Sequence, residues 1–267
     1  MRPVSGLIFC FLWIVCSWGT AGGSDSAARL FGTAIITIID PANGIIVAAD
    51  SKELEIRAGR KEPVVLSRCK ISRMADKLFF VASGYTRSSG KYDAARMVLE
   101  AYQLHKSASK ALDVAESRIQ RTLEKDLEEH RKESPEQFDK YLARPLEMAL
   151  FGSESGNLFR YATNFEIQSG PGAFREVKVT RYRCPGKSCP GGQAHMVFTG
   201  KTTGIDRYYK EHPPVHTNLS ELVAWVRQAM KEGIKAEPEL VGPPIDIIWV
   251  PRHGAFAWIE VKKECKS

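Results

Sequence analysis

The chain has 267 residues, of which 43% are hydrophobic and 26% are charged, as in an ordinary globular protein. This length allows one large domain or two small ones, with ample material for a hydrophobic core. The formal net charge is +7, but the lysines and arginines are scattered among acidic residues. They accompany no nucleic-acid-binding motif, so the composition argues against nucleic acid as the partner.

The N-terminal segment, residues 1–21, has the composition of a secretory signal peptide. Arg2 supplies the positive start, residues 7–18 supply an apolar run, and residues 19–21 are small, as signal peptidase requires. The apolar run is short for a membrane span, so we expect cleavage and no stable membrane anchor. The mature protein is then secreted or periplasmic, and residues 22–32 form a flexible spacer or a candidate propeptide.

Two short apolar segments, residues 32–38 and 44–51, are predicted to form a β-hairpin. The residues between them, 40–44, have the sequence D-P-A-N-G, which is typical of a turn. Neither segment alternates cleanly with polar residues, and this pattern indicates strands that are buried on both faces.

The register of this hairpin brings two polar groups together. If Ile39 pairs with Ile45, Ala34 lies opposite Asp50 in a simple antiparallel ladder. The hydroxyl of Thr33, at the start of the first strand, then lies beside the carboxylate of Asp50, at the end of the second. This corner is therefore a candidate reactive site, built by pairing between strands.

The rest of the chain continues with strands and helices in two blocks each. Asn218 is a good helix cap, with Glu221 three residues on. Two further helices are expected over residues 92–130, divided by a break at 106–109. Residues 125–140 are densely charged and are expected to form a solvated helix end and a loop. Further strands are expected at 70–74, 78–84, 147–152, 158–162, 176–183, 194–198, 245–250 and 255–261. This order suits two packed sheets covered by helices on both outer faces, in a single domain over residues 33–264.

Export makes disulfides chemically permissible for the cysteines beyond the signal segment. Cys184 and Cys189 bracket a short loop with the composition of a local disulfide. A zinc site at this loop would need two more ligands, and no second Cys or His pair stands at convincing spacing. Cys69 is read as a buried structural thiol and not as a nucleophile. Whether Cys69 pairs with Cys265 stays open.

The three hairpins resemble those of a proteasome β-type subunit, a branch of the N-terminal-nucleophile (Ntn) hydrolases. The likeness rests on residues 33–51, then on 70–84 with its lysine and small-residue turn, and finally on the closing segment 241–254. The resemblance implies an α+β fold built as a four-layer αββα sandwich. It also implies autoprocessing between Gly32 and Thr33, which would make Thr33 the first residue of the mature chain.

The resemblance assigns catalytic roles to four residues. Thr33 would be the nucleophile of an exported threonine protease or other amidohydrolase, with its own α-amine as the base. Lys70 would lower the pKa of that amine, Asp50 would hold Lys70 in place, and the backbone N–H of Gly84 would stabilise the oxyanion. The implied substrate is a peptide or another amide, and the chemistry needs no cofactor and no metal. Proteasome-like surfaces also make a homo-oligomer an open expectation.

Departures from the family pattern leave a second hypothesis open. The family usually has Gly-Ser-Gly where this chain has Gly200-Lys201-Thr202, and an aspartate and a serine where this chain has Pro238 and Val241. The missing polar groups support the amine and the threonine in the family. The alternative is a secreted binding or assembly protein that keeps the fold and has lost catalysis.

Overall fold

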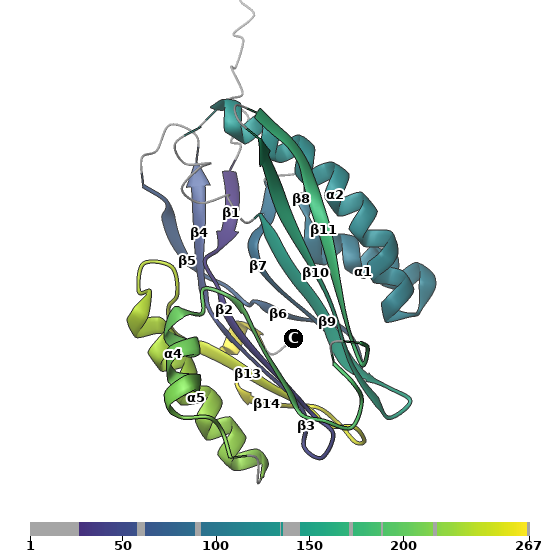
Figure 1. The fold of residues 1–267 in the computed structure, drawn as a ribbon. Helices are drawn as coiled ribbons and strands as arrows, with labels where there is room; N and C mark the ends of the chain where they lie inside the picture. The colour runs from purple at the N-terminus through teal and green to yellow at the C-terminus, as the bar shows by residue number, and fades with distance from the viewer. Residues whose placement is uncertain are drawn as a thin grey trace, which may run out of the picture.

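The computed structural model describes residues 27–57, 62–88, 92–133, 135, 145–170, 173–187, 189–215 and 218–265. The predicted signal peptide and the first part of the spacer lie outside these residues. The described chain is a mixed α/β structure with two antiparallel β-sheets and helices on both sides (Figure 1).

The larger sheet of the described residues has nine strands in the order β11-β10-β9-β7-β1-β4-β5, with β6 and β8 also paired to β7. Its strands are β1 (Ala27–Phe31), β4 (Lys52–Arg57), β5 (Val64–Ser67), β6 (Ile71–Ala75), β7 (Leu78–Ser88), β8 (Tyr92–Asp93), β9 (Leu146–Glu154), β10 (Asn157–Gly170) and β11 (Ala173–Cys184). The smaller sheet has the order β12-β2-β3-β13-β14. Its strands are β12 (His195–Gly200), β2 (Ala34–Asp40), β3 (Gly44–Asp50), β13 (Ile245–Val250) and β14 (Ala257–Glu260).

Three apolar clusters hold these elements together. One lies between the larger sheet and the helices α1 (Ala94–His105) and α2 (Ala108–Glu133). A second lies between the two sheets, and a third lies between the smaller sheet and the helices α4 (Thr203–Glu211) and α5 (Leu219–Ala236). Figure 1 shows α1 and α2 on one side of the sheets and α4 and α5 on the other. Each strand of the central hairpin therefore buries both of its faces.

Several predicted elements are confirmed. Strand β2 pairs with β3 in the expected register, with Ile39 opposite Ile45. The helical region breaks between α1 and α2, at the predicted place, with Lys106 in the left-handed conformation as the C-cap of α1. Helix α5 begins after Asn218, whose side chain accepts a hydrogen bond from the backbone N–H of Glu221 at 3.0 Å.

Strand β1 differs from the flexible spacer that the sequence predicts. Its residues Ala27–Phe31 pair antiparallel with β4 on one side and with β7 on the other. Strands β4 and β5 are also absent from the prediction. An unpaired strand edge leaves backbone donors and acceptors without partners, so β4 and β7 both gain hydrogen bonds when β1 lies between them.

Two disulfides join cysteines within the described part of the chain. One is the predicted local bridge between Cys184 and Cys189. The other joins Cys69, just before β6, to Cys265 in the short 3₁₀-helix η1 (Lys263–Cys265). Cys69 is therefore a half-buried disulfide cysteine, and the reading of it as a buried structural thiol is wrong. In the described part of the chain, no helix is both long enough and apolar enough to cross a membrane.

Candidate functional site

The carboxylate of Asp50, at the end of β3, is the centre of a buried polar cluster. One oxygen accepts hydrogen bonds from the backbone N–H of Ala34 at 3.0 Å and from Lys70 Nζ at 2.7 Å. The other oxygen accepts from the backbone N–H groups of Lys52 and Gly242, both at 3.0 Å. Four donors from four segments of the chain therefore fix this carboxylate, which is fully buried.

Lys70 forms a buried ion pair with Asp50, and its own side chain has no exposure to solvent. Burial lowers the pKa of the Lys70 ammonium from 10.5 to about 8, and the charge of Asp50 opposes this change. The backbone is fixed at this point because the preceding residue, Cys69, is bonded to Cys265. The ammonium is thus held in a defined position with a pKa close to neutral pH.

Thr33 lies directly before β2, next to this ion pair. The backbone N–H of the following residue, Ala34, is the one that Asp50 binds. Thr33 is 1% exposed, and its Oγ has no hydrogen-bond partner among the described residues. Its carbonyl oxygen accepts a hydrogen bond from the backbone N–H of Lys201 at 2.7 Å. Burial without a partner is costly for a hydroxyl, and Thr33 shares this feature with Thr37, Ser51 and Thr86.

The peptide between Gly32 and Thr33 packs tightly against the loop that precedes β13. A Cβ atom on Gly32 would lie 2.6 Å from the carbonyl oxygen of Leu240, so a side chain does not fit there without a backbone shift. Gly84, in the middle of β7, has a φ of +87° and lies opposite Phe31 of β1. Gly84 is therefore paired to the segment just before Thr33. The structure thus brings Lys70 and the start of β2, next to Thr33, to the carboxylate of Asp50. It links Gly84 to this site through the pairing of Gly84 with Phe31 of β1.

Ala82 and Thr86 lie two residues to either side of Gly84, and both are buried in β7. Ala82 is 1% exposed and belongs to the apolar cluster between the larger sheet and helices α1 and α2. Thr86 is 5% exposed. In this conformation Ala82 faces the helices and not the space between the sheets.

Glu147 on β9 is linked to Thr33 through Gly200, and the sequence analysis did not identify it. Its carboxylate accepts hydrogen bonds from the backbone N–H of Gly200 at 2.8 Å and from Ser83 Oγ at 3.4 Å. Gly200 touches Thr33 closely, because a Cβ atom on Gly200 would lie 1.9 Å from the Thr33 carbonyl oxygen. An acidic residue inside the apolar run 146–151 was the available signal, but the partners of Glu147 are remote in sequence.

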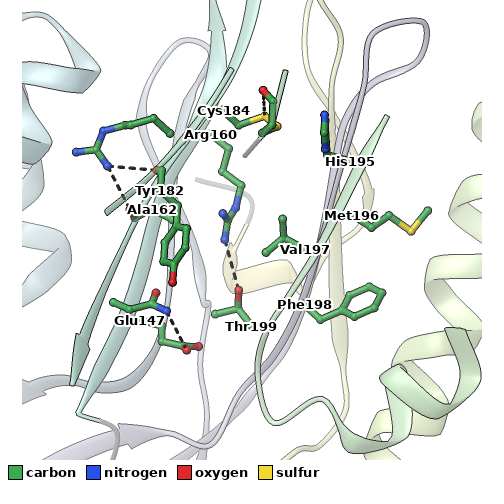
Figure 2. Close-up of a pocket in the computed structure, with 13 residues that line it drawn as sticks. Glu147, Arg160, Ala162, Tyr182, Cys184, His195, Met196, Val197, Phe198 and Thr199 are labelled. Atoms are coloured by element: carbon green, nitrogen blue, oxygen red, sulfur yellow. Dashed lines mark hydrogen bonds between the residues drawn. A yellow bond between two sulfur atoms is a disulfide. The ribbon is translucent and has the colours of Figure 1, made fainter. Parts of the chain in front are cut away.

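A pocket of about 360 Å³ extends from Glu147 between β10 and β11 on one side and β12 on the other. Figure 2 shows Arg160 of β10 pointing into this pocket toward Thr199 of β12. Met196 and Phe198 of β12 point away from Arg160, into the cluster beneath α4 and α5. In the described residues, no group of His, Cys, Asp and Glu side chains is arranged to hold a metal ion.

No protein-family model matches the chain, and no curated protein matches it. Among solved structures, the chain is similar to Anbu from Hyphomicrobium sp. strain MC1, with 16% sequence identity and a TM-score of 0.44 over 87% of this chain and 89% of that one. It is also similar to the (Gly-1) mutant of the same Anbu, with 16% identity and a TM-score of 0.43 over 87% of this chain and 88% of the other.

Proposed function

We propose that the chain is an exported N-terminal-nucleophile amidohydrolase or peptidase of the proteasome β-type fold, with Thr33 as the nucleophile. The observation that carries the proposal is the buried Lys70–Asp50 pair, which binds the amide directly after Thr33. The three apolar clusters support a four-layer αββα arrangement. The two disulfides support export, because such bonds persist mainly in oxidising compartments.

The chemistry requires a cut between Gly32 and Thr33. In the uncut chain the nitrogen of Thr33 is an amide and is not basic. After the cut it becomes an α-amine with an ordinary pKa near 8, and the nearby ammonium of Lys70 lowers that value. The amine can then take the proton of the Thr33 hydroxyl as the oxygen attacks.

The reaction then proceeds through an ester. Thr33 Oγ bonds to the substrate carbonyl carbon, the C–N bond breaks, and the leaving amine receives the proton that the α-amine had taken. Water next attacks the ester carbon, which releases the carboxylic acid and returns the hydrogen to Thr33 Oγ. The backbone N–H of Gly84 is proposed to stabilise the negative oxygen in both steps.

Strand β1 suggests how a peptide substrate would bind. It lies between β4 and β7, and its last residue, Phe31, is paired with Gly84. Departure of β1 after the cut would leave the facing edges of β4 and β7 free. An extended peptide could pair with these edges as an added strand, which would bring its backbone beside Thr33.

The test is the mass and N-terminal sequence of the purified exported protein and of two variants. We expect the wild-type chain to begin at Thr33 and the Thr33→Ala variant to remain uncut. Thr37→Ala is the matched control, because it removes another buried hydroxyl without a described partner, from the strand β2 that follows Thr33. Thr37→Ala should be cut like the wild type. A wild-type chain that begins near residue 22 would overturn the proposal of a hydrolase.

The second candidate function is a secreted binding or assembly protein without catalysis. The pairing of β1 on both sides favours it, since β1 stabilises the sheet as long as it stays attached. In this case residues 27–32 are retained in the mature protein. The same mass measurement therefore separates the two functions.

A further inference from the structure

Arg160 is a buried cation in the space between the two sheets. Its neighbours on the same face of β10, Leu158 and Ala162, belong to the apolar cluster between the sheets. Arg160 itself is 7% exposed. A guanidinium in such surroundings is costly unless its five N–H donors are satisfied.

The described residues satisfy Arg160 only in part. Its Nη2 donates a long hydrogen bond of 3.4 Å to Thr199 Oγ, and its Nε is buried with no hydrogen-bond partner (Figure 2). Within the described part of the chain, Arg160 forms no ion pair at a distance of 4.0 Å or less. The guanidinium of Arg160 therefore still has N–H donors available for a ligand in the pocket.

Glu147 lies in the same pocket and influences Arg160 from a distance. Burial lowers the pKa of the Arg160 guanidinium to about 10, and the charge of Glu147 opposes this change, so Arg160 keeps its charge at neutral pH. The carboxylate of Glu147 is already occupied by the backbone N–H of Gly200 and by the side chains of Ser83 and Asn164. Arg160 is thus the group in the pocket with unmet capacity for an anion.

We propose that this pocket is a substrate subsite in which Arg160 binds a carboxylate close to the scissile amide. The inference rests on the proposed function, since the pocket reaches Thr33 through Glu147 and Gly200. A carboxylate matches the planar guanidinium and carries one charge, which the nearby Glu147 tolerates better than the double charge of a phosphate. The volume of about 360 Å³ suits the C-terminal end of a peptide or an acylated amino acid.

The first test measures binding without catalysis. The probes are N-acetylalanine, its amide N-acetylalaninamide, and inorganic phosphate. Titration calorimetry measures the binding of each probe to the purified exported protein. We expect N-acetylalanine to bind at least about tenfold more tightly than the amide, because only the acid forms a charge-assisted hydrogen bond with Arg160. Phosphate that binds more tightly than N-acetylalanine would overturn the assignment of a carboxylate.

Variants locate the binding. Arg160→Met should remove the preference for the acid, and Arg160→Lys should keep part of it. Arg121→Gln is the matched control, since it removes one positive charge from the exposed face of α2, and it should bind like the wild type. If Arg160→Met does not fold, the Arg160 Nε–H resonance of the wild type gives the answer by NMR. An Nε–H resonance that N-acetylalanine does not move would disprove the site.

Peptide hydrolysis distinguishes this inference from the proposed function. Peptides with a free C-terminal carboxylate should be cleaved near that end about tenfold faster than their C-terminal amides. Equal cleavage of both forms would refute the subsite and leave the hydrolase intact. Binding of N-acetylalanine at Arg160 with no cleavage of any peptide would refute the hydrolase and leave a carboxylate-binding pocket.

Discussion

At the scale of single residues, the Lys70–Asp50 pair shows how burial and pairing act in opposite directions. Removal from water disfavours the ammonium, whereas the carboxylate at 2.7 Å favours it. The net result is a lysine that titrates near pH 8. Such a group is unusual in a merely structural role, since an ordinary lysine stays charged until above pH 10.

This titration predicts a pH dependence of stability. The pKa of Lys70 is about 8 in the folded protein and 10.5 in an ordinary environment, so between these values the unfolded chain holds a proton that the folded chain has lost. Unfolding therefore becomes less favourable as pH rises from 8 to 10.5, by about 3 kcal/mol from this group. Below pH 8 the full cost of the buried ammonium is present.

Urea unfolding of the wild type and of Lys70→Met at pH 7.5, 9 and 10.5 measures this effect. The difference in unfolding free energy between the two proteins should shift in favour of the wild type as pH rises. Identical pH dependences would show that Lys70 does not titrate in this range. If the ammonium of Lys70 also lowers the pKa of the Thr33 amine, the rate of peptide hydrolysis by the wild type should fall over the same pH range, because Lys70 loses its charge there.

At the scale of elements, local caps and remote pairing contribute differently. Helix α5 begins where its own sequence dictates, because Asn218 satisfies a backbone N–H that the helix cannot satisfy itself. Strand β1, in contrast, depends on partners that lie 20 or more residues away along the chain, as the pairs Leu30–Leu54 and Phe31–Gly84 show. A helix end can therefore be tested with one local substitution.

Asn218→Ala should lower the free energy of unfolding by about 1 kcal/mol, because it leaves the N–H of Glu221 without its acceptor. Asn218→Asp is the matched control. It keeps an acceptor oxygen at the cap and also removes the N-L-S glycosylation sequon, so it separates loss of the cap from loss of a glycan. Chemical denaturation of the three proteins measures the effect. Equal destabilisation by both substitutions would contradict the role of the cap.

At the scale of the whole molecule, the Cys69–Cys265 disulfide ties the second hairpin to the C-terminal end. It spans 196 residues of sequence, whereas Cys184–Cys189 spans only 5. A cross-link that closes a longer loop restricts the unfolded chain more strongly. The Cys69–Cys265 bond is therefore expected to contribute more to the free energy of unfolding than the Cys184–Cys189 bond.

Removal of the long bridge, in Cys69→Ala/Cys265→Ala, should cost about 5 kcal/mol on the chain-entropy estimate. Removal of the short bridge, in Cys184→Ala/Cys189→Ala, should cost about 2 kcal/mol on the same basis. Cys265, Cys184 and Cys189 are buried and Cys69 is half-buried, so both variants replace cysteines that are at least partly shielded from solvent. Thermal and denaturant unfolding of the two variants provide the measurement. A larger loss from the short bridge would contradict this ordering.

The sequence by itself determined features that depend on neighbouring residues. These are the central hairpin with Ile39 opposite Ile45, the break between the first two helices, the start of α5 at Asn218, and the Cys184–Cys189 bridge. Each follows from a turn, a cap or a short loop whose partners lie close together in the chain, so local composition is enough to predict it.

Only the tertiary structure decided the features that join remote segments. The register placed Asp50 beside the start of β2, but the fourfold binding of its carboxylate also needs Lys70 and Gly242. Strand β1, the contact of Glu147 with Gly200, and the buried Arg160 are of the same kind. Their partners are brought together by the packing of two sheets, and no local pattern in the sequence records which residues that packing will join.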